Sequence, residues 1–509
     1  MDTRDVEVKT ATYFDSEFCG RVPLNQTNMV QPHGALLVLE KTSGLIVQCS
    51  ENAPLFLFGE EKMLLHTPFN TFLTEESEKN WQQMQSSGWM GKMPVEMTVD
   101  GRPFLALVHA HPHYLIAEVE PLVKADAENI HLLEDLKFGL AEIDRATTVL
   151  AAGNIAVHAL QRISGFDKVM LYRFDEEWNG EVIAEVLTQG MDEYLGLRFP
   201  ASDIPAQARD LYQRNTYRLI PNINGPAPVK LTPVLNPITH TFTNLTDTNL
   251  RSVAPVHVQY LRNMGVQASM STRVLHAGKL WGLIACHHRT PKYLPYSTCA
   301  VFEMLSLVIS AKITAMEGAD AEAERSTMAD GLHDLKLAVH NRGALVPALI
   351  NHLPLLQHLL AADGVVVAHA KSFDQVGAVP NKTQLQDLLL WLQTTEVYDL
   401  WHTRCLAAHM EGADSYAEIA CGTVVLPIQP EKGFFILGFR KEEVQQVSWS
   451  GNPHERIRFE QDKKTYHPRH SFTVWQQTVR GRSRPWTPVV LESAERLRAF
   501  IATYQLHNL

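Results

Sequence analysis

The chain has 509 residues, of which 45% are apolar and 20% charged, and its formal net charge is −11. This composition is typical of a globular protein and excludes a disordered or fibrous one. The length exceeds what one hydrophobic core normally supports and predicts about three domains, at roughly 150 residues each. A net negative charge without clusters of Lys and Arg disfavours direct binding to nucleic acid or anionic lipid.

The start of the chain and its apolar runs indicate a cytoplasmic protein. Met1 is followed by acidic and basic residues rather than by the basic start and apolar stretch of a secretory signal. Continuous apolar runs, such as Leu280–Cys286, are much shorter than a membrane span. We therefore expect neither a membrane role nor a nucleic-acid role.

Six cysteines are present, and no two of them form a Cys-x-x-Cys motif. The spacing therefore predicts neither a zinc knuckle nor a dithiol redox site. Five of them are interpreted as small buried apolar residues: Cys49, Cys286, Cys299, Cys405 and Cys421. Cys19 differs because it lies in a polar arm of turn-forming residues, Asp15–Pro23, close to Arg21, a cation that favours the thiolate.

The first part of the chain predicts a small antiparallel sheet. Two pairs of short apolar runs indicate hairpins, the first joined by a turn at 41–44 and the second by Asp100-Gly101. The four runs are 35–40, 45–49, 95–99 and 104–109. We expect the N-terminal arm and the first domain at residues 1–121.

A second domain is expected at residues 122–316. Apolar residues recur at helical spacing over 133–163, and strand pairs follow at 168–187 and 269–287. About 80 residues rich in Pro, Asn and Thr separate the two strand pairs. A connection of this length is interpreted as functional. A helical pattern from Ala300 toward Asn341 then predicts a spine helix between domains.

The third domain, expected at residues 317–488, repeats the strand–turn–strand arrangement of the second at 423–439. Residues 441–486 leave it as a long excursion with nine Lys or Arg against five Asp or Glu. Such a segment must dock on another surface or be disordered. Apolar residues then alternate at four- and three-residue steps, the seam of a coiled coil: Val490, Ala494, Leu497, Ile501 and Tyr504. Residues 489–509 are therefore predicted to begin a dimeric output helix.

Four stretches of the sequence resemble signature stretches of bacteriophytochromes. They are Val30–Gly34, Pro200–Pro205, Cys286–His288 and Pro468–Phe472. Their order and spacing match the photosensory module of that family, which has PAS, GAF and PHY domains. The resemblance implies an α+β fold of three antiparallel-sheet domains joined by long spine helices. It also implies a figure-of-eight knot between PAS and GAF, and a tongue extending from PHY at about 441–486.

The resemblance implies a red and far-red light receptor that carries biliverdin IXα, a linear tetrapyrrole. The implied attachment is a thioether from the Cys19 sulfur to the ring A vinyl group, formed without a separate enzyme. Plant phytochromes carry their linking cysteine just before the residue that matches His257, where this chain has Val256. Cys19 is therefore the only matched attachment point, and biliverdin is favoured over a more reduced bilin.

The resemblance also implies polar contacts to the pigment. The backbone carbonyl of Asp203 would accept from the pyrrole N–H groups, and His257 would hold the central water and one propionate. His287 would bond the ring D carbonyl. Arg218 and Arg251 match the partners of the ring B propionate, since a guanidinium grips a carboxylate with two parallel bonds.

Further matched residues complete the implied pocket. Ser269 and Ser271 lie on one face of a strand and match the site of the other propionate. Tyr172, Phe199 and Tyr260 match the aromatic residues around ring D. Each residue type also has a plainer interpretation, such as core packing for an aromatic ring, and the flanking motifs favour the functional one.

The implied signal is a change in tongue structure. Light rotates ring D and breaks its contact with His287. In the red-absorbing state Arg469 pairs with the carboxylate of Asp203, and in the far-red-absorbing state Ser471 replaces Arg469 as the tongue changes from hairpin to helix.

Several features stay open at this stage. The tongue has Ser450 where a second glycine is usual and Gln477 where a glutamate is usual, so the ground state and its reversion rate are not predicted. The residues present are interpreted as a light sensor rather than an enzyme. A histidine kinase or a diguanylate cyclase is expected as the fused output domain. Homodimerisation is expected through the GAF and PHY helices and the C-terminal coiled coil, either parallel or antiparallel.

Two other classes of protein remain as alternatives. One is an enzyme that uses His257, His287 and His288 as metal ligands, although no carboxylate or cysteine completes a metal-binding spacing. The other is a PAS and GAF sensor of a diffusible small molecule.

Overall fold

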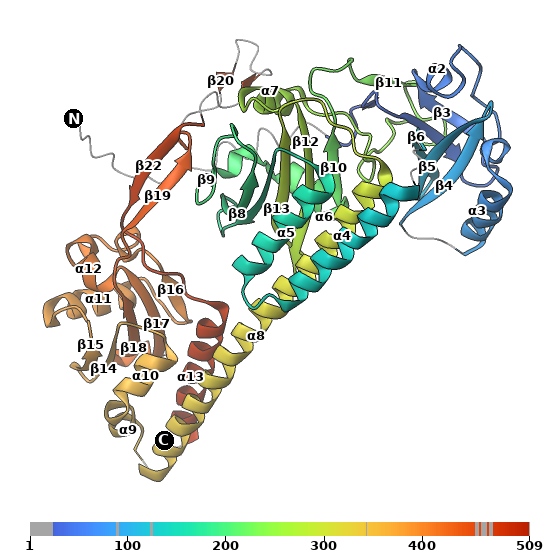
Figure 1. The fold of residues 1–509 in the computed structure, drawn as a ribbon. Helices are drawn as coiled ribbons and strands as arrows, with labels where there is room; N and C mark the ends of the chain where they lie inside the picture. Colours follow the sequence, from blue (N-terminus) through green and yellow to red (C-terminus); the bar gives the residue numbers. More distant parts are fainter. Residues whose placement is uncertain are drawn as a thin grey trace. The chain divides into compact units, whose positions relative to one another are not determined.

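The computed structural model describes residues 24–87, 91–122, 126–342, 344–453, 458–459, 466–467 and 472–507. The chain divides into two compact units, one from residues 1–314 with 448–475 and the other from 315–447 with 476–509. Three mainly antiparallel sheets form the framework, together with the long helix α8 (Tyr296–Arg342) (Figure 1). The expected α+β fold with three sheets is confirmed.

The N-terminal sheet has the strand order β1-β11-β3-β2-β6-β5-β4. Its strands are β1 (Met29–Val30), β2 (Ala35–Glu40), β3 (Ile46–Ser50), β4 (Lys92–Val99), β5 (Arg102–Ala110), β6 (Tyr114–Pro121) and β11 (Val229–Thr232). Helices α2 (Ala53–Phe58) and α3 (Glu75–Ser87) belong to the same part of the chain. Both predicted hairpins are present, and one strand, β11, comes from the long insertion of the second domain.

The N-terminal arm lies between two parts of that insertion. The carbonyl of Asn28 accepts from Leu231 N at 3.1 Å on one side. On the other side, Gln31 N donates to Leu250 O at 2.7 Å. Gly34 permits this close packing, because a Cβ there would lie 2.9 Å from Leu250 Cδ1. This is the local arrangement that the expected knot requires, and Cys19 lies outside the described residues.

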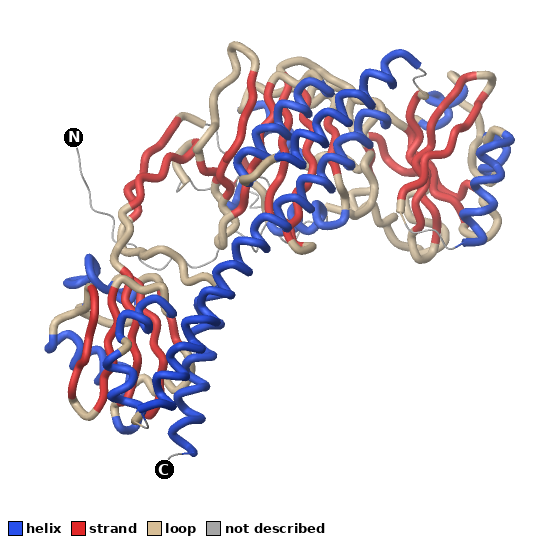
Figure 2. Tube along the Cα trace, turned by 60° about the horizontal axis from the view of Figure 1, so that its bottom comes forward, coloured by secondary structure: helices blue, strands red, loops and turns tan. Residues whose placement is uncertain are grey.

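The central sheet has the strand order β10-β12-β13-β7-β8-β9-β19-β22. Its strands are β7 (Lys168–Phe174), β8 (Gly180–Leu187), β9 (Arg198–Phe199), β10 (Tyr217–Ile220), β12 (Ala268–His276), β13 (Lys279–His288), β19 (Gln445–Ser450) and β22 (Val474–Val479). Helices α4, α5 and the first part of α8 cover one face of this sheet (Figures 1 and 2). The predicted helical pattern at 133–163 divides into α4 (Asp126–Arg145) and α5 (Val149–Ser164), because the Thr148 side chain caps the start of α5.

Helix α8 confirms the predicted spine helix. By length and composition it is also apolar enough to cross a membrane, which the search for continuous apolar runs in the sequence missed. Its apolar residues Phe302, Leu305, Ile309 and Ile313 are fully buried in the core beneath the central sheet. The hydropathy of this helix therefore includes residues of the core, and 39% of its apolar window is buried.

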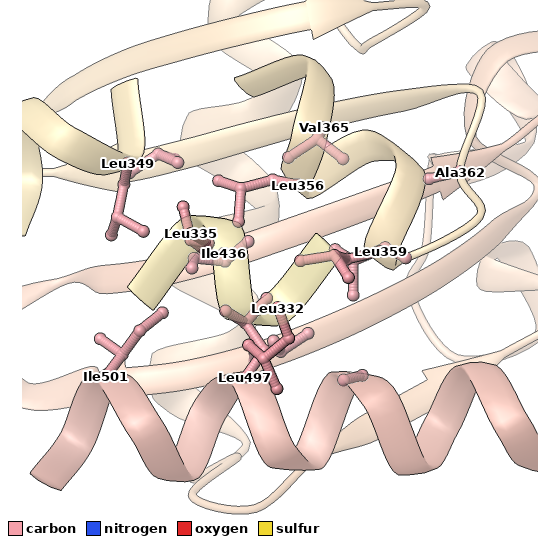
Figure 3. Packing of buried hydrophobic residues seen from close by; sticks show 14 of the residues in the cluster. Leu332, Leu335, Leu349, Leu356, Leu359, Ala362, Val365, Ile436, Leu497 and Ile501 are labelled. Carbon is pink, nitrogen blue, oxygen red and sulfur yellow. The ribbon is translucent and has the colours of Figure 1, made fainter. Parts of the chain in front are cut away.

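The third sheet has the strand order β15-β14-β18-β17-β16. Its strands are β14 (Gly364–His369), β15 (Ser372–Gly377), β16 (Trp401–Thr403), β17 (Gly422–Gln429) and β18 (Phe434–Arg440). Its helices are α9 (Leu345–Asn351), α10 (Leu353–Leu359), α11 (Lys382–Thr394), the short α12 (Ala417–Ala420) and α13 (Pro488–His507). Leucine, isoleucine and valine side chains from this sheet and from the helices α8, α9, α10 and α13 belong to one core (Figure 3).

The predicted coiled-coil seam has a different role in the structure. Val490, Ala494, Leu497 and Ile501 of α13 are buried in the core of the third sheet, together with Leu332 of α8 (Figure 3). The interpretation of these residues as an intermolecular seam is therefore wrong, because they already pack within the chain. The residue spacing predicted which face of α13 is apolar, but it did not predict that this face packs against the third sheet.

The excursion after β18 docks on the central sheet. Its strands β19 and β22 are neighbours in that sheet, and Trp449 of β19 pairs in parallel with Arg198 of β9. A smaller pair, β20 (Arg458–Phe459) and β21 (Tyr466–His467), lies farther along it. Arg469 and Ser471 lie outside the described residues.

Leu356→Ala tests the core of the third sheet. Leu356 is fully buried, so the substitution should lower the free energy of unfolding of this unit by about 2–5 kcal/mol through lost burial and a residual cavity. Urea denaturation followed by hydrogen exchange in β14 and β18 measures the change. Leu390→Ala is the matched control, because Leu390 is 62% exposed and its loss should change the free energy by less than about 0.5 kcal/mol. Equal effects of the two substitutions would contradict the assignment of the core.

Candidate functional site

The register of the central sheet places polar residues side by side on one face. Arg218 of β10 is paired with Ser271 of β12, and Ser269 of β12 is paired with His287 of β13. His287 is in turn paired with Lys168 of β7. Directly paired residues of an antiparallel sheet point to the same face. The face opposite α4, α5 and α8 therefore carries a row of polar residues across the four strands β10, β12, β13 and β7.

Arg218 and Arg251 are cations without an anionic partner in this part of the chain. Both guanidiniums donate to backbone carbonyls of segment 245–252, at 2.9–3.4 Å. No Asp or Glu oxygen of the described residues lies within 4.0 Å of either guanidinium. Burial and the neighbouring Arg251 charge lower the pKa of Arg218 to about 9, and burial lowers that of Arg251 to about 10.

Ser269 and Ser271 are both buried beside this positive charge. The Ser271 hydroxyl is hydrogen-bonded to the Tyr212 hydroxyl at 2.6 Å. Tyr212 lies on α6 (Ala206–Arg214), and burial raises the pKa of its phenol. It is not among the residues predicted from the sequence, because a tyrosine on an amphipathic helix is more simply explained by packing.

The two predicted histidines are neutral at pH 7. His257, on α7 (Pro255–Asn263), is half-buried, and burial, followed by the Arg218 charge, lowers its pKa to about 4. His287 is 6% exposed, and burial, followed by the charges of Lys168 and His257, lowers its pKa to about 3. The buried Nδ1 atom of His287 has no hydrogen-bond partner among the described residues.

His288 does not join these two histidines. Its Nδ1 atom accepts a hydrogen bond from Asp167 N at 3.1 Å. Within the described ranges, no group of three or more His, Cys, Asp or Glu side chains is arranged to hold a metal ion. This geometry gives no support to the metal-ligand alternative for His257, His287 and His288.

Asp203 ends the short helical turn Ala201–Asp203. The turn is held to the β7–β8 hairpin because Ala201 N donates to Asn179 Oδ1 at 3.2 Å. The Tyr260 hydroxyl donates to Asp203 Oδ2 at 2.9 Å. Phe472 of the tongue meets the Tyr260 ring edge to face, with centroids 5.2 Å apart. The carboxylate predicted to face the tongue is therefore linked to it through Tyr260.

The predicted aromatic residues lie in two connected groups. Tyr172 and Phe199 belong to one cluster, with ring centroids 5.8 Å apart, and Tyr194 meets Phe199 at 5.5 Å. Tyr260 stacks on His257 with centroids 6.0 Å apart. Phe472 joins the groups, because it packs against the Tyr172 cluster as well as against Tyr260.

A buried ion pair that the sequence analysis missed lies beside His287. Lys168 and Glu185 are 3.6 Å apart, and their side chains are 1% and 2% exposed. Glu185 also accepts from Tyr194 N and Leu195 N at 2.9 and 3.0 Å. The pair thus ties the loop before β9 to the sheet. A lysine at the start of an apolar strand was the available sequence signal.

A second buried carboxylate joins the N-terminal sheet to the insertion. Glu118 of β6 lies 3.5 Å from Lys92 Nζ and accepts from Leu250 N at 2.7 Å. Lys92 also donates to Asn249 Oδ1 at 2.6 Å, and the carbonyl of Asn249 accepts from Arg218. The position of the Arg218 guanidinium therefore depends on both sheets.

Comparisons with known proteins agree with this architecture. Family models match residues 19–122 (PAS fold), 150–313 (GAF domain) and 332–509 (phytochrome region). Cyanobacterial phytochrome B of Nostoc sp. is 33% identical over 96% of this chain and 66% of its own length. The bacteriophytochrome of Xanthomonas campestris is 32% identical over 97% of this chain and 80% of its own length. The chain thus spans about two thirds of the Nostoc relative.

Solved structures give the same result. The Stigmatella aurantiaca phytochrome photosensory core module has a TM-score of 0.82 and 34% identity, covering 96% of this chain and 98% of that one. A bacteriophytochrome from R. palustris has a TM-score of 0.82 and 30% identity, covering 96% and 99%. The chain therefore belongs to the phytochrome family of photoreceptors and contains a PAS-GAF-PHY photosensory module.

Proposed function

We propose that this chain binds biliverdin IXα covalently through Cys19 and responds to red and far-red light as the sensor of a bacterial phytochrome. The observation that carries the proposal is the pair of guanidiniums, Arg218 and Arg251, which have no carboxylate partner among the described residues. Arg251 is buried and Arg218 is half-buried, and a cation removed from water is costly unless an anion compensates it. The propionates of biliverdin would supply that negative charge.

The other polar groups fit the same ligand. Ser269 and Ser271 are hydroxyl donors for the second propionate. A neutral imidazole both donates and accepts, so His257 could hold the central water and His287 the ring D carbonyl. The unpartnered Nδ1 atom of His287 supports a polar ligand at this position. The carbonyl of Asp203 would accept from the pyrrole N–H groups.

The bound pigment would supply light absorption and isomerisation about the double bond to ring D. The protein would hold its carboxylates, exclude water and limit the movement of its terminal ring. Tyr172, Phe199 and Tyr260 are the aromatic side chains proposed to surround that ring. Their rings are packed against one another or against Phe472. A movement of one ring would therefore change the packing around Phe472 of the tongue.

We propose that the tongue reads the pocket through Asp203. Arg469 would pair with the Asp203 carboxylate in the red-absorbing state, and Ser471 would replace it as the tongue changes from hairpin to helix. Removing one partner of a buried ion pair costs about 3–5 kcal/mol, enough to shift a two-state element strongly. The hairpin strands β19 and β22 and the Phe472–Tyr260 contact support the first of these two states.

The two departures in the tongue differ in their surroundings. Ser450 is buried, and its hydroxyl donates to Phe472 O over 3.5 Å. Gln477 is half-buried. We infer that Ser450 favours the hairpin, because a glycine at this position would offer no hydroxyl to Phe472 O.

The remaining proposals concern the longer protein. The chain would be the sensor of a cytoplasmic homodimer, with a histidine kinase or diguanylate cyclase as output. We also propose the domain limits 1–121, 122–316 and 317–488. Dimer contacts would involve the GAF and PHY helices, and any coiled coil would begin after the part of α13 that is buried in the third sheet.

An absorption spectrum after incubation with biliverdin tests the function directly. We expect a red band that converts reversibly to a far-red band under alternating illumination, because the pocket would hold the pigment and permit isomerisation. A sensor of a diffusible molecule or a metal enzyme would not give these bands. Pigment that stays unbound, or binds without any spectral change in light, would refute the proposed function.

Cys19→Ser should abolish the covalent adduct, since serine lacks the nucleophilic thiolate. Zinc fluorescence of the protein band in a denaturing gel measures the adduct. Cys405→Ser is the control, because Cys405 is half-buried in the other unit and should leave the fluorescence unchanged. A fluorescent band that survives in Cys19→Ser would rule out this attachment site.

Asp203→Ala and Arg469→Ala should each uncouple the tongue from the pocket by removing one partner of the proposed ion pair. The measurements are the light-minus-dark difference spectrum and hydrogen exchange of residues 445–479 in both light states. Arg480→Ala, at an exposed position of the same excursion, is the control and should behave as the parent. Normal spectra with unaltered exchange in both variants would count against the coupling.

A further inference from the structure

Gly180, the first residue of β8, leaves an opening in the sheet that the phenol ring of Tyr172 fills. We propose that Gly180 is a positioning residue whose missing side chain fixes the conformation of Tyr172, and that this sets the space in which the terminal pyrrole ring turns. The inference rests on the proposed function, since Tyr172 is proposed to line that space. It assigns a role to a residue that touches no ligand itself.

The steric observation is direct. A Cβ built on Gly180 would lie 1.7 Å from Cζ, 1.8 Å from Cε1 and 2.2 Å from the hydroxyl oxygen of Tyr172. Real Cβ atoms essentially never approach another heavy atom within 3.0 Å. Any side chain at position 180 therefore excludes Tyr172 from its present place.

The backbone conformation does not explain the glycine. Gly180 does not have a positive φ. It is buried and is paired with Phe174 of β7. Glycine weakens a strand, so a buried strand glycine without a positive φ indicates a close approach by another group. Here the approaching group is the Tyr172 ring from the neighbouring strand.

The Tyr172 backbone has little freedom to move away. On its other side, a Cβ on Gly282 of β13 would lie 2.3 Å from the Tyr172 carbonyl oxygen, so β7 and β13 are in close contact. A register shift between Leu171 and Tyr172 sets the pairing with β8. With the backbone held on both sides, a side chain at position 180 would force Tyr172 into another staggered χ1 conformation.

The displaced ring would enter a crowded cluster. Tyr172 is 6% exposed and lies between Phe174, at 5.2 Å, and Phe199, at 5.8 Å. Tyr172 lies on the face of the sheet that carries His287, and the core beneath α4, α5 and α8 fills the other face, so a displaced ring would move toward His287. A phenol moved in that direction would take up volume that we assign to ring D.

Gly180→Ala in the biliverdin-loaded chain tests the inference. We expect at least a threefold lower yield of the far-red-absorbing state per absorbed photon. Gly180→Ala added to Tyr172→Ala should have no further effect, because the ring that the methyl group displaces is gone. Gly318→Ala on α8 is the matched control, since a Cβ there meets no atom within 4 Å, and its yield should equal that of the parent.

Two results would overturn the inference. One is a parental yield in Gly180→Ala, and the other is an equal loss in the presence and absence of Tyr172, which would indicate a general effect on the strand. If the parent chain binds no pigment, the proposed function is refuted. The steric relation between Gly180 and Tyr172 is then tested by urea unfolding of the pigment-free variants. Gly180→Ala should lower the unfolding midpoint of the parent but not that of Tyr172→Ala, and a lowering in both would reject it.

Discussion

The site depends on the cross-strand register of the central sheet. Side chains alternate between the two faces at a period of exactly two, so a slip of one residue would turn Arg218, Ser271 and His287 toward the helices. The register is held by the apolar residues between them, such as Met270 and Cys286, which are fully buried in the core beneath α5 and α8. The alternation that builds the core on one face therefore builds the polar row on the other.

The buried and half-buried charges of the first compact unit, residues 1–314 with 448–475, are of two kinds. Lys168 with Glu185, and Lys92 with Glu118, are paired within the chain and hold loops or sheets together. Arg218 and Arg251 have no such carboxylate among the described residues. A protein keeps uncompensated buried charge where function requires it, since stability alone would favour pairing or replacement. This contrast separates structural charges from those that we assign to a ligand.

The tongue and the pocket share a small number of contacts. Phe472 meets both Tyr260 and the Tyr172 cluster, while Tyr260 bonds the Asp203 carboxylate. Packed aromatic groups move between discrete arrangements rather than by continuous deformation. A rearranged ring on the pocket side would therefore present the tongue with a different surface. Ser450, buried in the hairpin, adds a contact that the glycine usual at this position could not make.

Local sequence patterns determined the elements of the fold. The hairpins at 35–50, 92–110 and 422–440 and the spine helix followed from alternation, turn residues and helical spacing. The motifs identified the family, and they supplied the residues that we propose for the site. They did not reveal the break at Thr148, because a cap inside an apolar pattern leaves the helical period intact.

Only the tertiary structure decided what covers each apolar face and which charges meet. The stripe on α13 has the spacing of a coiled coil but packs in the third sheet of the same chain. Tyr212, the Lys168–Glu185 pair and the Gly180 opening likewise join residues that lie 8 to 59 positions apart. Periodicity records which side of an element is apolar, but a contact depends on the position of the second element, which no local pattern contains.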